Sequence, residues 1–204
     1  MITKSRYWNF HTDRDPILAG FIRKETTLNI DPTWYSVDPA RLDQLCAIPF
    51  IYVKDLAYVR SKTELQNIRE YLQRGGFLCI DACTTPPRTP DMEVYLRTNR
   101  DILQRLIPGV EILRLPETHA IYHCYFKVQP GDFFPLPNGT PRSREHDGLY
   151  GVFEGKRMVG VISMYGLECG WPESPARKPG CMKMIVNIYV YAMTHSADAV
   201  ATSP

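Results

Sequence analysis

Gly75-Gly76-Phe77-Leu78-Cys79-Ile80-Asp81 is the stretch that decides the fold of this 204-residue chain. Glycine adopts the left-handed conformation that closes many helices, and a helical pattern leads directly into this glycine pair. Phe77 to Ile80 are apolar without a break, which is typical of a strand buried on both faces. Asp81 follows at the carboxyl end of that strand. Helix, glycine, buried strand and acid in this order predict an open α/β sheet, in which ligands bind beyond the strand ends.

The residues before this stretch predict a helix and another strand. Ser61 and Glu64 form a capping-box pattern, in which their side chains satisfy free amides of the first helical turn. Apolar residues then recur at helical spacing as far as Leu72. Before the helix, residues 50–53 (FIYV) form a second apolar strand. A strand, a helix and a strand therefore follow one another.

The second half of the chain continues this alternation. We expect a helix over residues 91–106, a strand over 110–113, a β-hairpin over 149–162 and a closing helix over 182–193. The prediction is a single α/β domain over residues 1–195, with a mostly parallel sheet and helices on both sides. An antiparallel hairpin near the C-terminus completes the predicted sheet.

Length, composition and charge exclude several classes of protein. The length suits one α/β domain, and 44% apolar with 23% charged residues is ordinary for a soluble globular protein. A formal net charge of +2 without any run of Lys or Arg argues against nucleic acid as a partner. No apolar run is long enough to span a bilayer, and residues 1–8 lack the apolar core of a signal peptide. We expect a cytoplasmic location by default, or a periplasmic or exported one if a leader has been removed, and a disordered tail at 196–204.

Several segments, in order, carry a resemblance to a known family. They are IPFIYVKD at 48–55, LQNIREYLQRGGFLCID at 65–81, LPETHAIYHCYF at 115–126, and GVFEGKRMVGVISMYGLECGW at 151–171 with VNIYVYAMTH at 186–195. Together they resemble the bacterial family called domain of unknown function 4159, over nearly the whole chain up to His195.

The resemblance implies a fold and leaves the activity open. The family is thought to adopt a class I glutamine-amidotransferase-like, flavodoxin-like three-layer sandwich. Its members often belong to larger exported or membrane-anchored proteins that are encoded near MoxR-type ATPases and von Willebrand A-type proteins. The resemblance therefore implies a protein partner of these kinds, and we predict no cofactor.

This chain departs from the family pattern at two places. Asp81 keeps one of two acidic residues that often follow the glycine pair, and Ala82-Cys83 comes next. The usual Asp-His-Pro is replaced by Thr118-His119-Ala120, whereas His123 falls where the family often has a histidine.

Cys83 is a candidate nucleophile. Amidotransferases of this fold hold a cysteine on a tight elbow between small residues, because the backbone must turn sharply beside an oxyanion hole. Here the flanking glycines are absent, and a proline pair follows soon after. A hydrolase with Cys83 would need His119 or His123 as its base and Asp81 to orient that base. The structural alternative is a loop thiol.

His119 and His123 are also candidate metal ligands. Two histidines four positions apart lie on one face of a helix, which supplies half of a zinc or iron site. Asp81 would complete the site, with Cys124 or Glu117 as substitutes. The structural alternative is one histidine bonded to backbone under a loop and the other exposed.

Further candidates for ligand binding are Asp81, Glu168 and Trp171. An acid at a central strand end suits a ligand or an orienting role, and it also suits a cap on the following turn. Trp171 lies between Gly170 and Pro172, where it either covers a crevice or plugs the core. Lys54, with other basic residues near it, is interpreted as part of a solvated face.

From the sequence we favour a non-catalytic binding module for a ligand or a protein. Its predicted surface comprises Asp81, the loop at 84–90, His119, His123 and the Trp171 loop. The alternatives are an amide or ester hydrolase using Cys83 and a histidine, and a metal-dependent enzyme using both histidines with Asp81.

Overall fold

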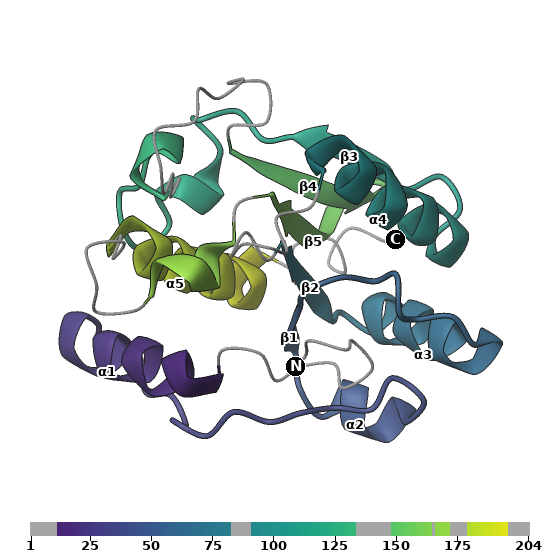
Figure 1. Ribbon diagram of the computed structural model, residues 1–204, viewed down its shortest axis with the longest axis horizontal. Helices are drawn as coiled ribbons and strands as arrows, with labels where there is room; N and C mark the ends of the chain where they lie inside the picture. The colour runs from purple at the N-terminus through teal and green to yellow at the C-terminus, as the bar shows by residue number, and fades with distance from the viewer. Residues whose placement is uncertain (1–11, 83–90, 134–147, 165, 172–178, 196–204) are drawn as a thin grey trace, which may run out of the picture.

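A five-stranded mixed sheet forms the centre of the structure (Figure 1). This computed structural model describes residues 12–82, 91–133, 148–164, 166–171 and 179–195. The strands lie in the order β1-β2-β5-β4-β3. Their bounds are Phe50–Val53 for β1, Phe77–Asp81 for β2, Glu111–Arg114 for β3, Leu149–Glu154 for β4 and Arg157–Ser163 for β5.

The sheet combines parallel and antiparallel pairing. β2 lies between β1 and β5 and is parallel to both, whereas β4 is antiparallel to β5 and to β3. The sequence predicts a mostly parallel sheet, and the structure instead divides it into a parallel part and an antiparallel part. In the parallel part, Tyr52 pairs with Cys79, and Asp81 pairs with Ser163. This register places the carboxyl ends of β1, β2 and β5 at one edge.

Glycine is required at the two positions before β2 for two separate physical reasons. Gly75 has a φ of 96°, which favours glycine because a side chain is strained there. At Gly76 a Cβ atom would overlap the ring of Tyr71, from the last turns of α3 (Lys62–Gln73). The Tyr71 hydroxyl accepts a hydrogen bond from the Phe77 amide at 3.0 Å, so the ring fixes the start of β2. All five residues of β2 are buried, which confirms the predicted strand.

The capping box of α3 is present as predicted. The Ser61 hydroxyl accepts a hydrogen bond from the Glu64 amide at 3.1 Å, and the Glu64 carboxylate accepts one from the Ser61 amide at 3.1 Å. Both bonds satisfy amides that the first helical turn leaves free. The helix therefore starts where its sequence signal indicates.

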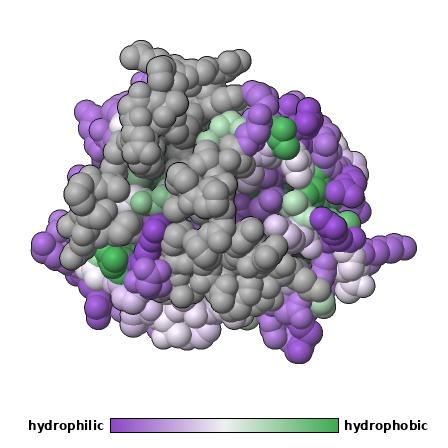
Figure 2. Space-filling view, in the orientation of Figure 1, coloured by the Kyte–Doolittle hydropathy of each residue, from purple (hydrophilic) through white to green (hydrophobic). Residues whose placement is uncertain are grey.

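Helices lie on both sides of the sheet. Figure 1 shows α3 and α4 on one side, and α1 and α5 on the other. The described surface in Figure 2 is largely hydrophilic with small apolar patches, as expected when apolar side chains fill the core. The remaining helical bounds are Asp15–Glu25 for α1, Leu42–Cys46 for α2, Met92–Leu106 for α4 and Pro179–His195 for α5, with the 3-10 turns η2 at Ala120–Tyr122 and η5 at Leu167–Gly170.

Within the described ranges, no helix has both the length and the apolar character needed to cross a bilayer. The predicted tail at 196–204 lies outside the described residues, as does the loop at 84–90.

Candidate functional site

The carboxyl ends of the three parallel strands bring polar side chains together in the interior. Asp81 ends β2 and Ser163 ends β5, while Lys54 follows β1 directly. All three are buried, and Asp81 is 0% exposed. Because Tyr52 pairs with Cys79 in parallel register and side chains alternate between faces, Tyr52, Lys54 and Asp81 share one face of the sheet. The local register thus builds the first part of the site.

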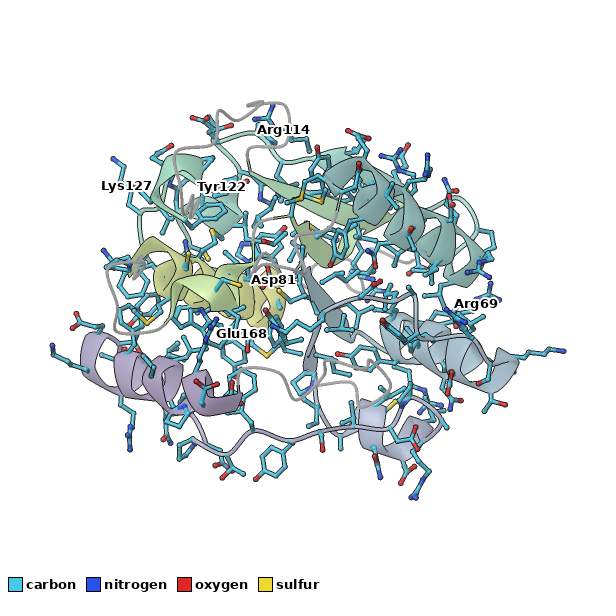
Figure 3. All side chains as sticks on the ribbon, viewed as in Figure 1. Arg69, Asp81, Arg114, Tyr122, Lys127 and Glu168 are labelled. Carbon is cyan, nitrogen blue, oxygen red and sulfur yellow. The ribbon has the colours of Figure 1, made fainter. Side chains whose placement is uncertain are left out.

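Asp81 binds the loop that covers this edge. Its two carboxylate oxygens accept hydrogen bonds from the backbone amides of Leu167 at 2.9 Å and Glu168 at 3.4 Å, both in η5. The Tyr52 hydroxyl donates a further hydrogen bond to Asp81. Figure 3 shows Asp81 and Glu168 close together near the middle of the molecule. Asp81 therefore binds the backbone of a turn 86 residues further along the chain. The turn that directly follows Asp81, which the sequence-based alternative has it cap, extends outside the described residues.

Lys54 and Glu168 form an ion pair in the interior. Their side chains are 5% and 1% exposed, so neither charge is solvated by bulk water. The Lys54 ammonium also lies 5.1 Å from the centre of the Tyr52 ring. Lys54 is therefore not part of a solvated face: the register of β1 turns it inward, where Glu168 from the covering loop supplies the opposite charge.

Asp15, the first residue of α1, brings a third carboxyl group to this cluster. It is buried, and Lys54 acts on its charge. We call Asp15, Lys54, Asp81 and Glu168 the ionic cluster. The four side chains carry excess negative charge when all of them are ionised, and one further cation lies beside them, because the Arg14 guanidinium donates a hydrogen bond to the Glu168 carbonyl oxygen at 3.3 Å.

Burial raises the pKa of two of these carboxyl groups. The pKa of Asp81 rises to about 6, because burial opposes its ionisation more strongly than Lys54, Tyr52 and the Leu167 amide favour it. Burial likewise raises the pKa of Asp15 to about 6, against the opposing effect of Lys54. Displaced pKa values of this kind gather at functional sites, although buried structural networks also produce them.

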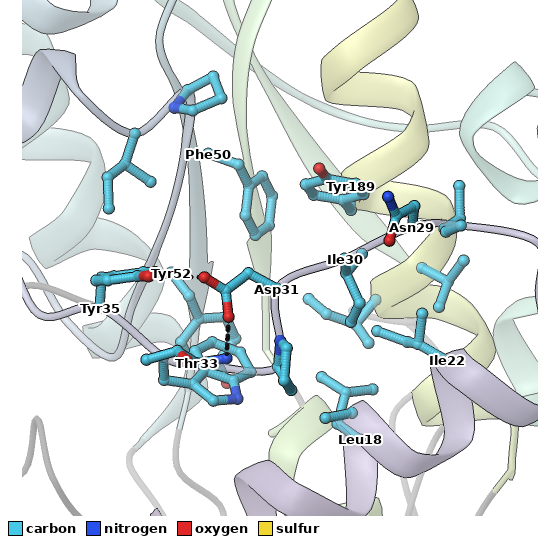
Figure 4. A pocket seen from close by; sticks show the side chains of 18 of the residues that line it. Leu18, Ile22, Asn29, Ile30, Asp31, Thr33, Tyr35, Phe50, Tyr52 and Tyr189 are labelled. Atoms are coloured by element: carbon cyan, nitrogen blue, oxygen red, sulfur yellow. Dashed lines mark hydrogen bonds between the residues drawn. The ribbon is translucent and has the colours of Figure 1, made fainter.

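A pocket adjoins the ionic cluster. It has a volume of about 550 Å³ and lies between α1, residues 28–35, β1 and α5 (Figure 4). Ligand pockets of roughly 300–1,000 Å³ with mainly apolar walls are usual for small molecules. The Tyr52 ring lines this pocket while its hydroxyl binds Asp81, so one side chain belongs to both features.

Residues 28–35 form the outer wall of the pocket. Trp34 and Tyr35 are 38% and 54% exposed, which is unusual for large aromatic side chains. Asp31 accepts hydrogen bonds from the Tyr35 hydroxyl at 2.7 Å and from the Thr33 amide at 2.8 Å (Figure 4). These hydrogen bonds, that of Tyr35 first, lower the pKa of Asp31. Phe50 and Tyr189 face each other edge to face on the inner wall, with ring centres 5.7 Å apart.

The structure brings together two of the predicted ligand-binding residues, Asp81 and Glu168, and the third, Trp171, is buried as they are. Trp171 is 1% exposed, and its ring centre lies 6.3 Å from those of both Trp34 and Tyr52. It therefore packs behind the pocket wall rather than covering an open crevice.

The two candidate histidines, His119 and His123, contact described residues near them and not the ionic cluster. His119 accepts a hydrogen bond from the Ile121 amide at 3.2 Å, and its ring packs against Tyr191 of α5. Burial lowers the pKa of His119, and His195 lowers it further. His123 is exposed, and its Nε2 atom lies 2.9 Å from the Glu117 carbonyl oxygen.

Neither histidine has a described contact with Asp81. Among the described residues, no three His, Cys, Asp or Glu side chains are arranged to hold a metal ion. Cys83 lies outside the described residues, so its role as a nucleophile stays a prediction.

Sequence reasoning missed the pocket, Tyr52 and Asp15. A signal was present for Tyr52, which lies two positions before Lys54 on the same strand face. Residues 28–35 lack helical or alternating apolar periodicity, so no local pattern marks them as a pocket wall.

Fold and site together define an α/β protein with a buried ionic cluster at the carboxyl ends of its parallel strands and an adjoining aromatic pocket beside β1. The chain belongs to the family described as Domain of unknown function (DUF4159), whose family model matches residues 2–193. This match confirms the resemblance seen in the sequence. No curated protein matches the chain.

Proposed function

We propose that the chain is a non-catalytic binding module whose ligand occupies the pocket between α1, residues 28–35, β1 and α5. The observation that carries the proposal is a pocket of about 550 Å³ lined by the aromatic rings of Trp34, Tyr35, Phe50, Tyr52 and Tyr189. Aromatic and apolar walls with few polar groups are usual for pockets that bind small molecules.

The adjoining charges support binding rather than catalysis. Asp81 accepts hydrogen bonds from Tyr52 and from the η5 backbone, and Lys54 is paired with Glu168. Groups held in this way stabilise the covering loop and the inner wall of the pocket. The described residues that line the pocket include no Cys, His, Lys or Arg, which are common nucleophiles, bases and anion ligands.

The amidotransferase-like, flavodoxin-like classification belongs to the same proposal. Its support is the parallel run β1-β2-β5 with helices on both sides of the sheet. The antiparallel pairs of β4 with β5 and β3 extend this core at the other side. On such a fold, ligands collect near the carboxyl ends of the parallel strands, where the ionic cluster lies.

A pocket-filling substitution tests the proposal. Ala47 lines the pocket and is exposed, so Ala47→Trp fills space without disturbing the core. Leu113→Trp is the matched control, because Leu113 is 52% exposed on β3, away from the pocket residues. Small aromatic and aliphatic fragments are screened by saturation-transfer NMR against the wild type, and the hits are titrated into both variants.

We expect at least tenfold weaker binding of the hits to Ala47→Trp and unchanged binding to Leu113→Trp. Thermal unfolding of the three proteins checks that each is folded. A screen without hits, or hits that bind Ala47→Trp as well as the wild type, would overturn the proposal.

A further inference from the structure

We infer that the ligand of this pocket is a small organic cation, an amine carried on an apolar or aromatic body. This inference rests on the proposed binding function and adds the chemical class of the ligand. It is carried by the charges that face the pocket, the rings that line it and the geometry of Asp31.

The formal charge on the pocket wall is negative. Among the described residues that line the pocket, Asp31 is the only one with a formal charge. Asp31 is exposed, so an ammonium group that reaches it gains a carboxylate partner that water partly screens, whereas an anion at the same place is repelled. The wall therefore selects by charge.

The ionic cluster behind the pocket wall also favours a cation over an anion in the pocket. Tyr52 separates the pocket from Asp81, and the three carboxyl groups of the cluster share a single lysine. The summed field of such a cluster extends into the adjoining pocket, because the intervening protein screens it less than water does. A cation in the pocket is stabilised by this field.

The aromatic rings suit the body and the charge of such a ligand. Trp34 and Tyr35 stand at the rim, and Phe50 and Tyr189 line the wall opposite. The negative faces of aromatic rings attract an ammonium group, and the same rings bury apolar surface. A volume of about 550 Å³ accommodates a small molecule with its apolar body against Leu18 of α1.

The carboxylate of Asp31 is fixed in a position where it can accept hydrogen bonds from an ammonium group. The Tyr35 hydroxyl and the Thr33 amide fix its carboxylate, and these hydrogen bonds, that of Tyr35 first, lower the pKa of Asp31. A carboxylate accepts about four hydrogen bonds, so acceptor capacity remains for the N–H groups of a ligand. In Figure 4 the Asp31 side chain lies between Tyr35 and the wall that carries Phe50 and Tyr189.

Three probes of matched shape test the inference: 3-phenylpropylamine, 3-phenylpropanol and 3-phenylpropionate at pH 7. They present a cation, a neutral hydroxyl and an anion on the same body. We measure their dissociation constants by ¹H–¹⁵N NMR titration of the wild type, Asp31→Asn and Asp101→Asn. Asp101, an exposed carboxylate on α4, controls for the loss of one negative charge anywhere.

We expect the amine to bind the wild type at least tenfold more tightly than the alcohol, and the carboxylate to bind most weakly. Asp31→Asn should remove most of the preference for the amine and leave alcohol binding unchanged, whereas Asp101→Asn should change neither. Added salt should weaken only the binding of the amine. Tyr35→Phe, which removes one of the donors that fix Asp31, should weaken amine binding severalfold.

Amine and alcohol binding with equal affinity, both lost in Ala47→Trp, would overturn the inference while the binding function stands. The inference also fails if none of the three probes binds while other fragments do so in a manner sensitive to Ala47→Trp. Failure of every fragment to bind would remove the binding function itself.

Discussion

The Tyr52 hydroxyl donates a hydrogen bond to the Asp81 carboxylate, and the ring of the same tyrosine lines the pocket. Tyr52 therefore joins the pocket wall to the ionic cluster through a single side chain. The contact follows from the sheet itself, because Tyr52 pairs with Cys79 in parallel register and Asp81 lies two positions further on the same face.

Tyr52→Phe separates these two roles of the tyrosine. The ring remains to line the pocket, but Asp81 loses one donor while it stays buried. Hydrogen bonds to charged groups contribute roughly 1.5–3 kcal/mol, so we expect the free energy of unfolding to fall by about that amount. Urea unfolding at pH 7 measures the loss, and affinity for pocket ligands should change less than twofold.

Tyr35→Phe is the control for this substitution, because Tyr35 is 54% exposed and its loss should change stability by about 0.5 kcal/mol or less. Equal stability of Tyr52→Phe and the wild type would show that the Tyr52 hydroxyl is not bound to Asp81 in solution.

The raised pKa of Asp81 makes stability depend on pH in a definite direction. Its pKa is about 6 in the folded protein, against an ordinary value of 3.8 that represents the unfolded chain. Between these values the folded state binds more protons than the unfolded state, so stability falls as pH rises from about 4 to about 6. The loss for this one group is on the order of 3 kcal/mol. Asp15, raised for the same reason, acts in the same direction.

Asp81→Asn isolates this contribution. The amide of the variant is neutral at every pH, so it adds no pH dependence of its own. The variant should be less stable than the wild type at pH 4.5, because an NH2 group replaces one of the two oxygens that accept from the Leu167 and Glu168 amides. Its stability should then change less than that of the wild type between pH 4.5 and 6.5. Urea unfolding across this range measures both slopes. A wild-type stability that rises relative to the variant over the same range would contradict the assigned pKa.

Local signals were sufficient to predict the elements around β2. The capping box at Ser61 and the glycine pair depend on neighbours a few residues away, and α3 and β2 appear where these signals place them. Asp81 was identified because it directly follows an apolar strand. Each of these inferences needed only the conformational preferences of a short segment.

The rest of the fold and site depends on contacts between distant residues. β2 pairs with β5, a strand far along the chain that no local pattern indicates as its partner. The amides that bind Asp81 belong to Leu167 and Glu168, and the charge of Lys54 is tolerated inside only because Glu168 arrives from that loop. The sequence suggests Asp81 and Glu168 as candidate ligand-binding residues, but it contains no local signal that they meet.

The glycine pair offers a test of the packing around β2. Gly76→Ala would place a methyl group within the Tyr71 ring, and the overpacking should lower the free energy of unfolding by about 1–3 kcal/mol or more. Gly75→Ala should lower it by about 1–2 kcal/mol, because its φ of 96° strains any L side chain. Gly20→Ala, in α1 with open space around it, should be neutral or stabilising. Urea unfolding of the three variants measures these losses, and a Gly76→Ala variant as stable as Gly20→Ala would mean that Tyr71 does not cover Gly76.

The ion pair between Lys54 and Glu168 yields the last prediction. Lys54→Met keeps the length and apolar stem of the side chain but leaves Glu168 buried without its partner, which should cost about 3–5 kcal/mol. Because Lys54 opposes the effect of burial on Asp81 and Asp15, its loss should also raise the pKa of both carboxyl groups and move the pH dependence to higher pH. Adding Glu168→Gln to Lys54→Met should recover part of the lost stability, since the uncompensated charge is removed. Urea unfolding of the two single variants and the double variant at pH 7 gives the coupling energy. If the losses of stability in the two single variants simply added up in the double variant, Lys54 and Glu168 would not form a buried ion pair. The covering loop would then contribute no charge to the ionic cluster.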